Sequence, residues 1–530
     1  MGQRFRTGRP DSMSPHAMVS SAHPLASQAG LSVLQRGGNA VDAAIAVNAV
    51  LNVAQPQMCG LGGDLFALIY SAKEGEVRSL NGSGHSPFAA DRAKLLASEG
   101  AVVPLDGVIA ANVPGCLDAW QLLHKEYGSL PLAGLLEPAM GYAKEGVPVS
   151  ALLHEYISSG LQRLRKYPSS MRVMCPDGGV PAVGSTLRQH DLAQTLQLVA
   201  EGGRDAFYEG PIARQIVDYC REHGGLLAER DFREHSSEWG RPIETTYRGY
   251  RVLEHPPNSQ GFALLAQLNL VELLDVKAHD LFSSDFVHLL IEIKKIAFSD
   301  RDAFNTDPRS MTIAVEDLIS KLRARKQIAQ VDPSKARRPG AAPAQDGDTT
   351  YFCVRDRDGN AVSCIQSIFH SFGCGEVADG TGLFLQNRMS AFSLDPRSVN
   401  RLEPHKRTAH TLNPAMVFEK DRLAVVLGTM GGDGQTQTLL QILIAMLDFG
   451  YSPQEALELP RWRSDEGLRV VVENRFPEET YRGLSARGHV VELVGDWSQM
   501  MGHAHLIREA HGGVLIGAAD PRGDGVAVGY

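Results

Sequence analysis

One aspartate and threonine pair, Asp348-Thr349, could supply an unusual nucleophile. A threonine at the start of a chain carries both a hydroxyl nucleophile and an α-amine, and the amine can act as base for the hydroxyl. The reference pKa of an α-amine, roughly 7.7 to 8.0, is far closer to neutrality than that of a lysine, which suits this task. Thr349 would reach that state if its hydroxyl attacked the carbonyl of Asp348 and the resulting ester were hydrolysed. The alternative, from residue type alone, is an ordinary β-branched residue that begins a strand.

The elements that must hold Thr349 are predicted to be a β-hairpin. Apolar runs at 351–354 and 361–369 flank the turn Asp358-Gly359-Asn360, and such a turn between two β-type runs is a good hairpin signal. Thr349 would begin the first strand, and Ser367 would lie on the second. Residues 332–348 are typical of a linker, and self-cleavage needs such a flexible tail because the new chain end must move aside.

The stretch from 348 to 362 resembles the start of the small subunit in the γ-glutamyltransferase family of self-cleaving enzymes. Gly-Gly-Asn-Ala-Val-Asp-Ala-Ala at 37–44 and Gly-Leu-Gly-Gly at 60–63 are similar to the start of its large subunit, and the resemblance covers nearly the whole chain. It implies an α/β fold, the four-layer αββα sandwich of N-terminal nucleophile hydrolases, with a large helical excursion in the first subunit. It also implies a large subunit of residues 1–348 and a small subunit of residues 349–530. These would remain together as a heterodimer, and its further dimerisation is left open.

A second glycine cluster, Gly431-Gly432-Asp433-Gly434, stands between a strand pattern at 423–428 and an apolar helix pattern at 436–448. Free N–H groups at a helix start attract negative charge, here the oxyanion of a tetrahedral intermediate. The family resemblance implies that Gly431 and Gly432 form this oxyanion hole. A dinucleotide-binding loop is the alternative, but the Gly-x-Gly-x-x-Gly spacing and a following βαβ unit are missing. The loop at 60–64 lacks the Gly-Lys-Ser/Thr of a P-loop and is interpreted as a tight turn.

The residues that grip the substrate's α-carboxylate and α-amine in γ-glutamyl enzymes are replaced in this chain. By register from Thr349, the family's asparagine becomes Phe369, its acidic residue becomes Ala391, and its serine pair falls on His410-Thr411. The family's arginine has no counterpart within 81–87. Losing the carboxylate that pairs with an ammonium group costs several kcal/mol of recognition. The chain is therefore more similar to the acylase and amidohydrolase branches of the family.

Ser367 can take the role of the second-strand hydroxyl that, in the family, hydrogen-bonds the nucleophile region. Candidates for holding a substrate carboxylate are Arg388, His410, Thr411 and His85, since cationic and polar side chains suit that group. His503 and His505 could be two metal ligands on one strand face, but no acidic or cysteine partners cluster nearby in the sequence, so a core or surface pair is favoured. We expect no metal and no cofactor.

Composition excludes several classes of partner. A net charge of −9 argues against nucleic acid, and the sequence contains neither a secretory signal pattern nor an uncharged apolar stretch of about 18 residues. The seven cysteines are scattered, without a Cys-x-x-Cys pair, which fits a reducing compartment. We therefore expect a cytoplasmic protein that acts on a small molecule and has neither nucleic acid nor membrane as a partner.

The leading hypothesis is a self-processing amidohydrolase or acylase that forms an acyl-enzyme on Thr349. Its substrate would be an amide of a small carboxylate-bearing group that is glutaryl-, oxamate- or γ-glutamyl-like. A γ-glutamyltranspeptidase or glutathione hydrolase with a rebuilt pocket is the alternative among enzymes. An unprocessed, non-catalytic binding protein that keeps the fold is the alternative from another class.

Overall fold

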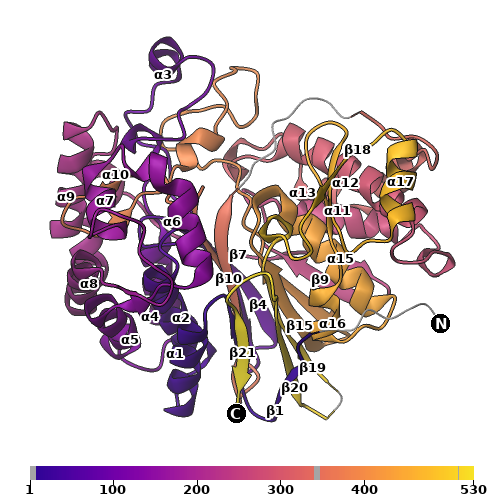
Figure 1. Ribbon diagram of the computed structural model, residues 1–530, viewed down its shortest axis with the longest axis horizontal. Coiled ribbons are helices and arrows are strands. Elements are labelled where there is room, and N and C mark those ends of the chain that lie inside the picture. The colour runs from indigo at the N-terminus through magenta and orange to yellow at the C-terminus, as the bar shows by residue number, and fades with distance from the viewer. Residues whose placement is uncertain (1–7, 339–346, 511) are drawn as a thin grey trace.

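Two seven-stranded antiparallel sheets form the centre of the molecule in the computed structural model, which describes residues 8–338, 347–510 and 512–530 (Figure 1). The first sheet has the order β21-β2-β10-β11-β3-β4-β7, with strands Val526–Gly529, Met18–Ser21, Asp348–Arg355, Ala361–Phe369, Asp64–Ser71, Glu76–Gly82 and Glu238–Gly240. The second has the order β1-β20-β19-β15-β14-β9-β8, with strands Ser12–Ser14, Leu515–Ala519, Ala504–Glu509, Arg422–Thr429, Ala415–Glu419, Tyr250–Glu254 and Ile243–Tyr247.

The sheets stack because their strands are apolar on both faces. On β3, Leu65, Ala67 and Ile69 pack into a core under helices, whereas Phe66 and Leu68 belong to the core between the sheets. Successive side chains of a strand point to opposite faces, so an unbroken apolar run serves two cores at once. On β15 of the second sheet, Leu423 and Val426 belong to the core between the sheets, whereas Ala424, Val425 and Leu427 pack under helices.

Helices cover the outer face of each sheet, which gives the predicted αββα layering (Figure 1). The first sheet is covered mainly by α1 (Pro24–Gln35) and α2 (Ala40–Ala54), and the second by α11 (Gly261–Val271), α12 (Ser284–Phe304) and α15 (Gln435–Leu447). All 15 residues of α2 are buried, as its small side chains predict. Its start is fixed by a capping box in which Asn39 and Asp42 exchange side-chain and backbone bonds.

The predicted helical excursion lies between β4 and β8 and occupies one side of the molecule (Figure 1). It contains α3 (Arg92–Glu99), η1 (Val108–Ala110), α4 (Cys116–Tyr127), α5 (Leu132–Glu145), α6 (Ala151–Leu164), α7 (Pro168–Met174), α8 (His190–Tyr208), α9 (Pro211–Glu222) and α10 (Glu229–Arg233), with β5 (Val147–Pro148) paired to β6 (Thr186–Leu187).

The remaining elements are short. The helical ones are η2 (Val276–Ala278), η3 (Pro308–Ser310), α13 (Val315–Leu318), α14 (Lys321–Gln327), η4 (Ile328–Gln330), η5 (Arg388–Ala391), η6 (Gly432–Gly434), α16 (Pro453–Glu458), α17 (Glu478–Ala486) and η7 (Gln499–Met501). Two small sheets pair β12 (Val377–Ala378) with β13 (Leu383–Phe384), and β16 (Trp462–Ser464) with β17 (Arg469–Glu473) and β18 (Val490–Val494).

The segment interpreted as a linker, 332–348, is only partly described, since 339–346 lies outside the described residues. Its first part is anchored rather than loose, because α12 supplies buried polar side chains to its backbone. His288 Nε2 donates to the carbonyl of Asp332 at 2.8 Å, and Lys295 Nζ donates to the carbonyl of Arg337 at 2.9 Å. Glu292 accepts the Arg337 N–H at 3.1 Å. Composition could not reveal these contacts, because the partners lie in a distant helix.

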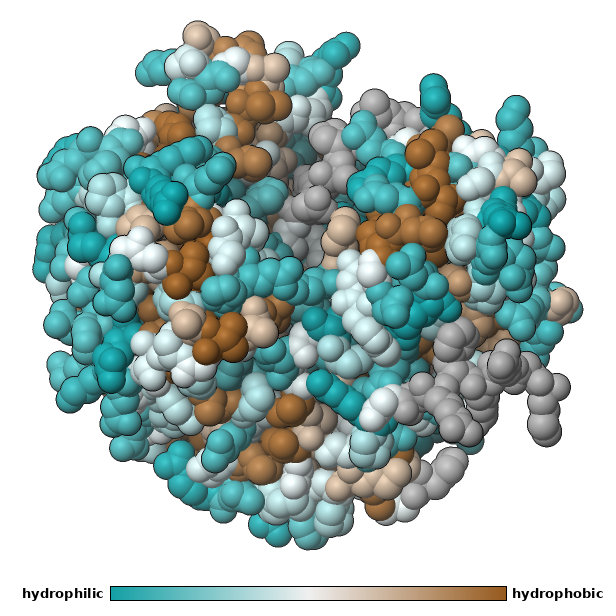
Figure 2. Space-filling model, in the orientation of Figure 1, coloured by the Kyte–Doolittle hydropathy of each residue, from teal (hydrophilic) through white to brown (hydrophobic). Residues whose placement is uncertain are grey.

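The surface shown in Figure 2 is mostly hydrophilic, with hydrophobic side chains visible beside α3 and along β18. On β18, Val490 is 61% exposed and Leu493 45%. All seven cysteines are free thiols, and each is buried. Across the described ranges, no helix has both the length and the apolar character required to cross a membrane.

Candidate active site

Thr349 lies at an irregularity in the predicted hairpin, which is confirmed as β10 and β11. The register shifts between Asp348 and Thr350, so that two residues of β11, Ser367 and Ile368, stand opposite Thr349 alone. Bulges of this kind redirect side chains and are common next to active sites. Thr349 is 2% exposed, and its hydroxyl has no hydrogen-bond partner within the described structure.

The hydroxyl of Ser367 is bonded to the carbonyl that self-cleavage would attack. Ser367 Oγ donates to the carbonyl oxygen of Asp348 at 2.7 Å. It accepts the N–H of Phe369 at 2.7 Å and lies 3.4 Å from Nη2 of Arg388. Both of these neighbours are donors only, so the single hydroxyl proton points to the carbonyl. The bond between Asp348 and Thr349 is thereby polarised toward nucleophilic attack.

Arg388 is a cation enclosed in the protein behind Ser367. Its guanidinium carbon lies 3.9 Å from the ring centroid of Phe369, and its Nε and Nη1 have no partner within the described structure. Burial lowers the pKa of Arg388 to about 9, against the opposing charge of Asp64. Burial likewise raises the pKa of Asp64 to about 7, although Arg388 counteracts this. A buried cation with unused donors is costly unless an anion approaches it, so Arg388 can receive one.

His410 and Thr411, two further predicted carboxylate ligands, have different surroundings. His410 Nε2 lies 3.1 Å from Oδ2 of Asp64, and burial lowers the pKa of His410 well below its ordinary value. The imidazole is therefore a neutral support for Asp64. The Thr411 carbonyl accepts the side-chain amide of Gln260 at 2.8 Å, which also bonds the carbonyl of Gly432 at 3.0 Å. The Thr411 hydroxyl has no partner within the described structure.

His85, the fourth predicted carboxylate ligand, lies in a separate cluster of rings. It stacks on His405 at 4.3 Å between centroids and is 6.0 Å from His235. Burial and the charge of Arg407 lower the pKa of His85, so the ring is neutral. Among the described residues no hydrogen bond or ion pair joins His85 to Arg388, and the structure does not bring these two candidates together.

The predicted strand, glycine turn and helix are confirmed as β15, η6 and α15. Gly431 and Gly432 have φ values of 117° and 53°, a region that favours glycine. The turn lies close to the bond before Thr349, since a Cβ built on Gly347 would be 3.6 Å from Cα of Gly432. The geometry therefore places the glycine pair beside the nucleophile candidate.

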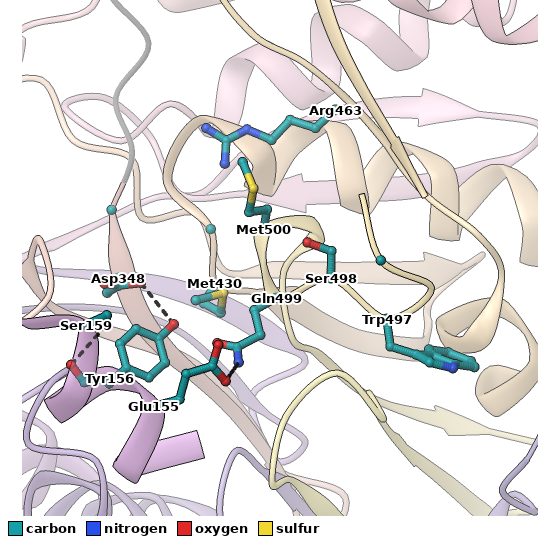
Figure 3. A pocket seen from close by; sticks show the side chains of 13 residues that line it. Glu155, Tyr156, Ser159, Asp348, Met430, Arg463, Trp497, Ser498, Gln499 and Met500 are labelled. Atoms are coloured by element: carbon teal, nitrogen blue, oxygen red, sulfur yellow. Dashed lines mark hydrogen bonds between the residues drawn. The ribbon is translucent and has the colours of Figure 1, made fainter. Parts of the chain in front are cut away.

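A cavity of about 530 Å³ opens beside Asp348 (Figure 3). Its walls include Asp348, Gly431 and Met430, Tyr156 from α6, and Arg463 from β16, together with the segment 495–500. The Tyr156 hydroxyl donates to Oδ1 of Asp348 at 3.4 Å. The cavity thus adjoins both the residue before Thr349 and the glycine turn.

Sequence reasoning missed the residues that α6 and the 495–500 segment contribute to this cavity. Gln499 donates to Glu155 of α6 at 3.2 Å, although the two are 344 positions apart. Arg463 forms a buried ion pair with Asp465 at 2.7 Å. Neither segment carries a motif, so only the folded chain brings them to the site.

The two histidines considered as metal ligands, His503 and His505, are buried core residues near β19. Within the described ranges, the close group of possible metal ligands is instead His288, Glu292 and His489. The two histidines are already hydrogen-bonded, with His288 Nδ1 2.8 Å from His489 Nε2. The carboxylate of Glu292 already accepts a hydrogen bond from the Lys295 ammonium group at 2.8 Å. A cation there would have to displace an ammonium group, so these residues serve to anchor 332–337.

Comparison with known proteins identifies the family. The model of the family described as gamma-glutamyltranspeptidase matches residues 26–530. The chain belongs to the γ-glutamyltranspeptidase family. It is similar to the glutathione hydrolase-like YwrD proenzyme of Bacillus subtilis, with 44% identity over 97% of this chain and 98% of that protein. It is also similar to the oxamate amidohydrolase proenzyme of Klebsiella pneumoniae, with 36% identity over 98% of this chain and 99% of that protein.

Among solved structures, cephalosporin acylase from Bacillus halodurans has a TM-score of 0.94 with 38% identity, over 100% of this chain and 98% of that one. These γ-glutamyltranspeptidase-family relatives establish the chain as an amidohydrolase with the N-terminal nucleophile hydrolase fold, and they favour the acylase and amidohydrolase branches, as predicted.

Proposed function

We propose that this member of the family cleaves itself between Asp348 and Thr349 and then hydrolyses the amide bond of a small carboxylate-bearing substrate. The observation that carries the proposal is the Ser367 hydroxyl bonded at 2.7 Å to the carbonyl of Asp348. A donor held on that oxygen is what the first tetrahedral intermediate requires.

In the self-cleavage step, Thr349 Oγ1 bonds to the carbonyl carbon of Asp348. Negative charge develops on the carbonyl oxygen, where Ser367 donates its proton as a hydrogen bond. The C–N bond then breaks, the Thr349 nitrogen takes up the hydroxyl proton, and an ester links the two residues. Water hydrolyses the ester, which leaves Asp348 with a carboxylate and Thr349 with a free hydroxyl and a free amine.

In turnover, the freed amine of Thr349 accepts the hydroxyl proton while the oxygen attacks the substrate carbonyl. The oxyanion is held by N–H groups of Gly431 and Gly432, which the turn presents beside the nucleophile. The amine product leaves with a proton, and water hydrolyses the acyl-enzyme to release the acid.

A carboxylate on the acyl group is supported by Arg388, whose Nε and Nη1 lack partners within the described structure. Thr411 supplies a free hydroxyl near the glycine turn. The precursor already places one carboxyl group at the site, since Tyr156 donates to the side chain of Asp348 at 3.4 Å. His410 supports Asp64 rather than contacting substrate.

A panel of acyl-p-nitroanilides tests this assignment. Glutaryl and valeryl have acyl chains of equal length, but only glutaryl carries a terminal carboxylate. We expect the wild type to prefer glutaryl by about tenfold or more in kcat/KM, as one charge-assisted contact provides. Arg388→Met should remove that preference while leaving valeryl turnover nearly unchanged.

We expect γ-glutamyl-p-nitroanilide to be a poor substrate, with little transfer to glycylglycine, because Phe369 and Ala391 replace the residues that would grip its ammonium group. Equal use of glutaryl and valeryl would remove the carboxylate from the proposal. Efficient γ-glutamyl transfer would instead place the chain with the transpeptidases.

A further inference from the structure

One face of α12 is directed at the glycine turn. Lys294, Phe298 and Arg301 are spaced by four and three positions, which places them on one side of a helix. Lys294 Nζ lies 4.1 Å from the ring centroid of Phe298, and the Arg301 guanidinium carbon lies 3.9 Å from it. Two cations therefore flank one aromatic ring.

Arg301 grips the residue that follows the glycine pair. Its Nη1 and Nη2 lie 2.5 and 3.2 Å from the two carboxylate oxygens of Asp433, and both side chains are at least nine-tenths buried. Arg301 Nη1 also donates to Gln260 at 3.0 Å, and the Gln260 amide donates to the carbonyl of Gly432 at 3.0 Å. The turn is thus tied at two successive residues to one guanidinium group.

The contact between Arg301 and Asp433 also affects the charge beside the glycine pair. Asp433 directly follows Gly432, so an unneutralised carboxylate there would oppose an oxyanion held by the glycine pair. Burial lowers the pKa of Lys294 to about 7, so its charge is only partly present near neutrality. Arg301 retains its charge at all working pH values, and its guanidinium pairs with Asp433 at 2.5 Å and with Asp302 at 2.7 Å.

We propose that Arg301 is a positioning residue for the oxyanion hole. It fixes Gly431 and Gly432 through Asp433 and Gln260, and its positive charge offsets the Asp433 carboxylate beside the developing oxyanion. The proposal rests on the proposed function. Arg301 lies in 1–348 and Asp433 in 349–530, so the large fragment would determine the geometry of a site that the small fragment supplies.

The test measures kcat and KM with the acyl-p-nitroanilide that the wild type cleaves fastest. Arg301→Met should be cleaved normally between Asp348 and Thr349, since the oxyanion of self-cleavage is held by Ser367. Its kcat should fall about thirtyfold or more, which approaches the reduction caused by removing one oxyanion donor. Its KM should change less than about twofold. Inhibition by a boronic acid that forms a tetrahedral adduct should weaken in parallel with kcat.

A second mutation separates positioning from simple destabilisation. Asp433→Asn added to Arg301→Met removes the carboxylate that has lost its Arg301 partner, so the double variant should recover part of the lost kcat. If each substitution only damaged the structure, the two reductions in kcat would instead add. Arg301→Lys, which keeps the charge but not the paired bonds, should be intermediate and provides a milder variant if Arg301→Met does not fold.

The matched control is Arg323→Met, which removes another paired Arg–Asp contact on α12, to Asp300 at 2.7 Å. It should lower the Tm and leave kcat unchanged. Arg301→Met with kcat within about twofold of wild type, or a double variant worse than Arg301→Met, would overturn the assignment. If Thr349→Ala stays active, the proposed function itself fails; if Thr349→Ala is inactive while Arg301→Met keeps kcat, only the role of Arg301 is lost.

Discussion

At the residue scale, the proposal of self-cleavage rests on the orientation of one hydroxyl. Ser367 Oγ receives N–H donors from Phe369 and Arg388, so its own proton is directed to the carbonyl of Asp348. The sequence predicted Ser367 as a partner of the nucleophile region, by resemblance. It also predicted Arg388 as a candidate for holding a carboxylate. It could not predict that Arg388 is enclosed behind Ser367, because residue type alone does not separate a buried arginine from a surface one.

Ser367→Ala should slow self-cleavage by about tenfold or more, because the first oxyanion loses its side-chain donor. The measurement is the fraction of full-length chain on denaturing gels over time after synthesis. Ser367→Thr keeps the hydroxyl and should mature at a rate close to that of the wild type. An alanine variant that matures as fast as wild type would contradict the role given to Ser367.

Asp64 should make stability depend on pH. Its carboxyl stays protonated in the folded protein up to a pKa of about 7, whereas in the unfolded chain it ionises near its ordinary value. Folding therefore takes up a proton between about pH 4 and 7, and the Asp64 contribution to stability falls as pH rises through that window. The loss approaches roughly 1.4 kcal/mol per pH unit.

Asp64→Asn keeps the shape of the side chain but cannot ionise. The Tm difference between variant and wild type, measured from pH 4 to 7, should shift in favour of the variant as pH rises. Parallel pH profiles for the two proteins would show that Asp64 is already ionised in the folded state.

At the element scale, the sequence predicted what local periodicity determines. The hairpin around 358–360, the buried helix α2 and the strand, turn and helix at 422–447 were all found, since each combines a hydrophobic pattern with turn residues. The sequence did not predict the elements that contact the site from distant positions in the chain. Tyr156 meets Asp348 across 192 positions, and Arg301 meets Asp433 across 132. Their helical patterns are ordinary, and only topology gives them a role.

Gly432→Val tests the turn as an element with a chemical role. Gly432 has a φ of 53°, which a β-branched residue adopts only under strain, so the turn should move. We expect a correctly cleaved protein with kcat at least about tenfold lower, as when an oxyanion donor is displaced. A cleaved variant with unchanged kcat would show that the oxyanion is held elsewhere.

At the scale of the whole molecule, both sheets are built from both predicted fragments. In the first sheet, β10 and β11 lie between β2 and β3, so strands of 349–530 are paired on either side with strands of 1–348. In the second sheet, β14 pairs with β9, and β20 pairs with β1. Cleavage at one peptide bond would leave these ladders intact. The fragments should therefore stay associated until the molecule unfolds.

The central claim is that Thr349 becomes a chain terminus and the nucleophile, and mass analysis of the denatured protein tests it most directly. The wild type should give two fragments, 1–348 and 349–530, the second beginning with Thr349, while the native protein migrates as one species with amidase activity. Thr349→Ala should give one intact chain without that activity. An active wild type found only as an uncut chain, or a Thr349→Ala variant that is cut and active, would contradict the account.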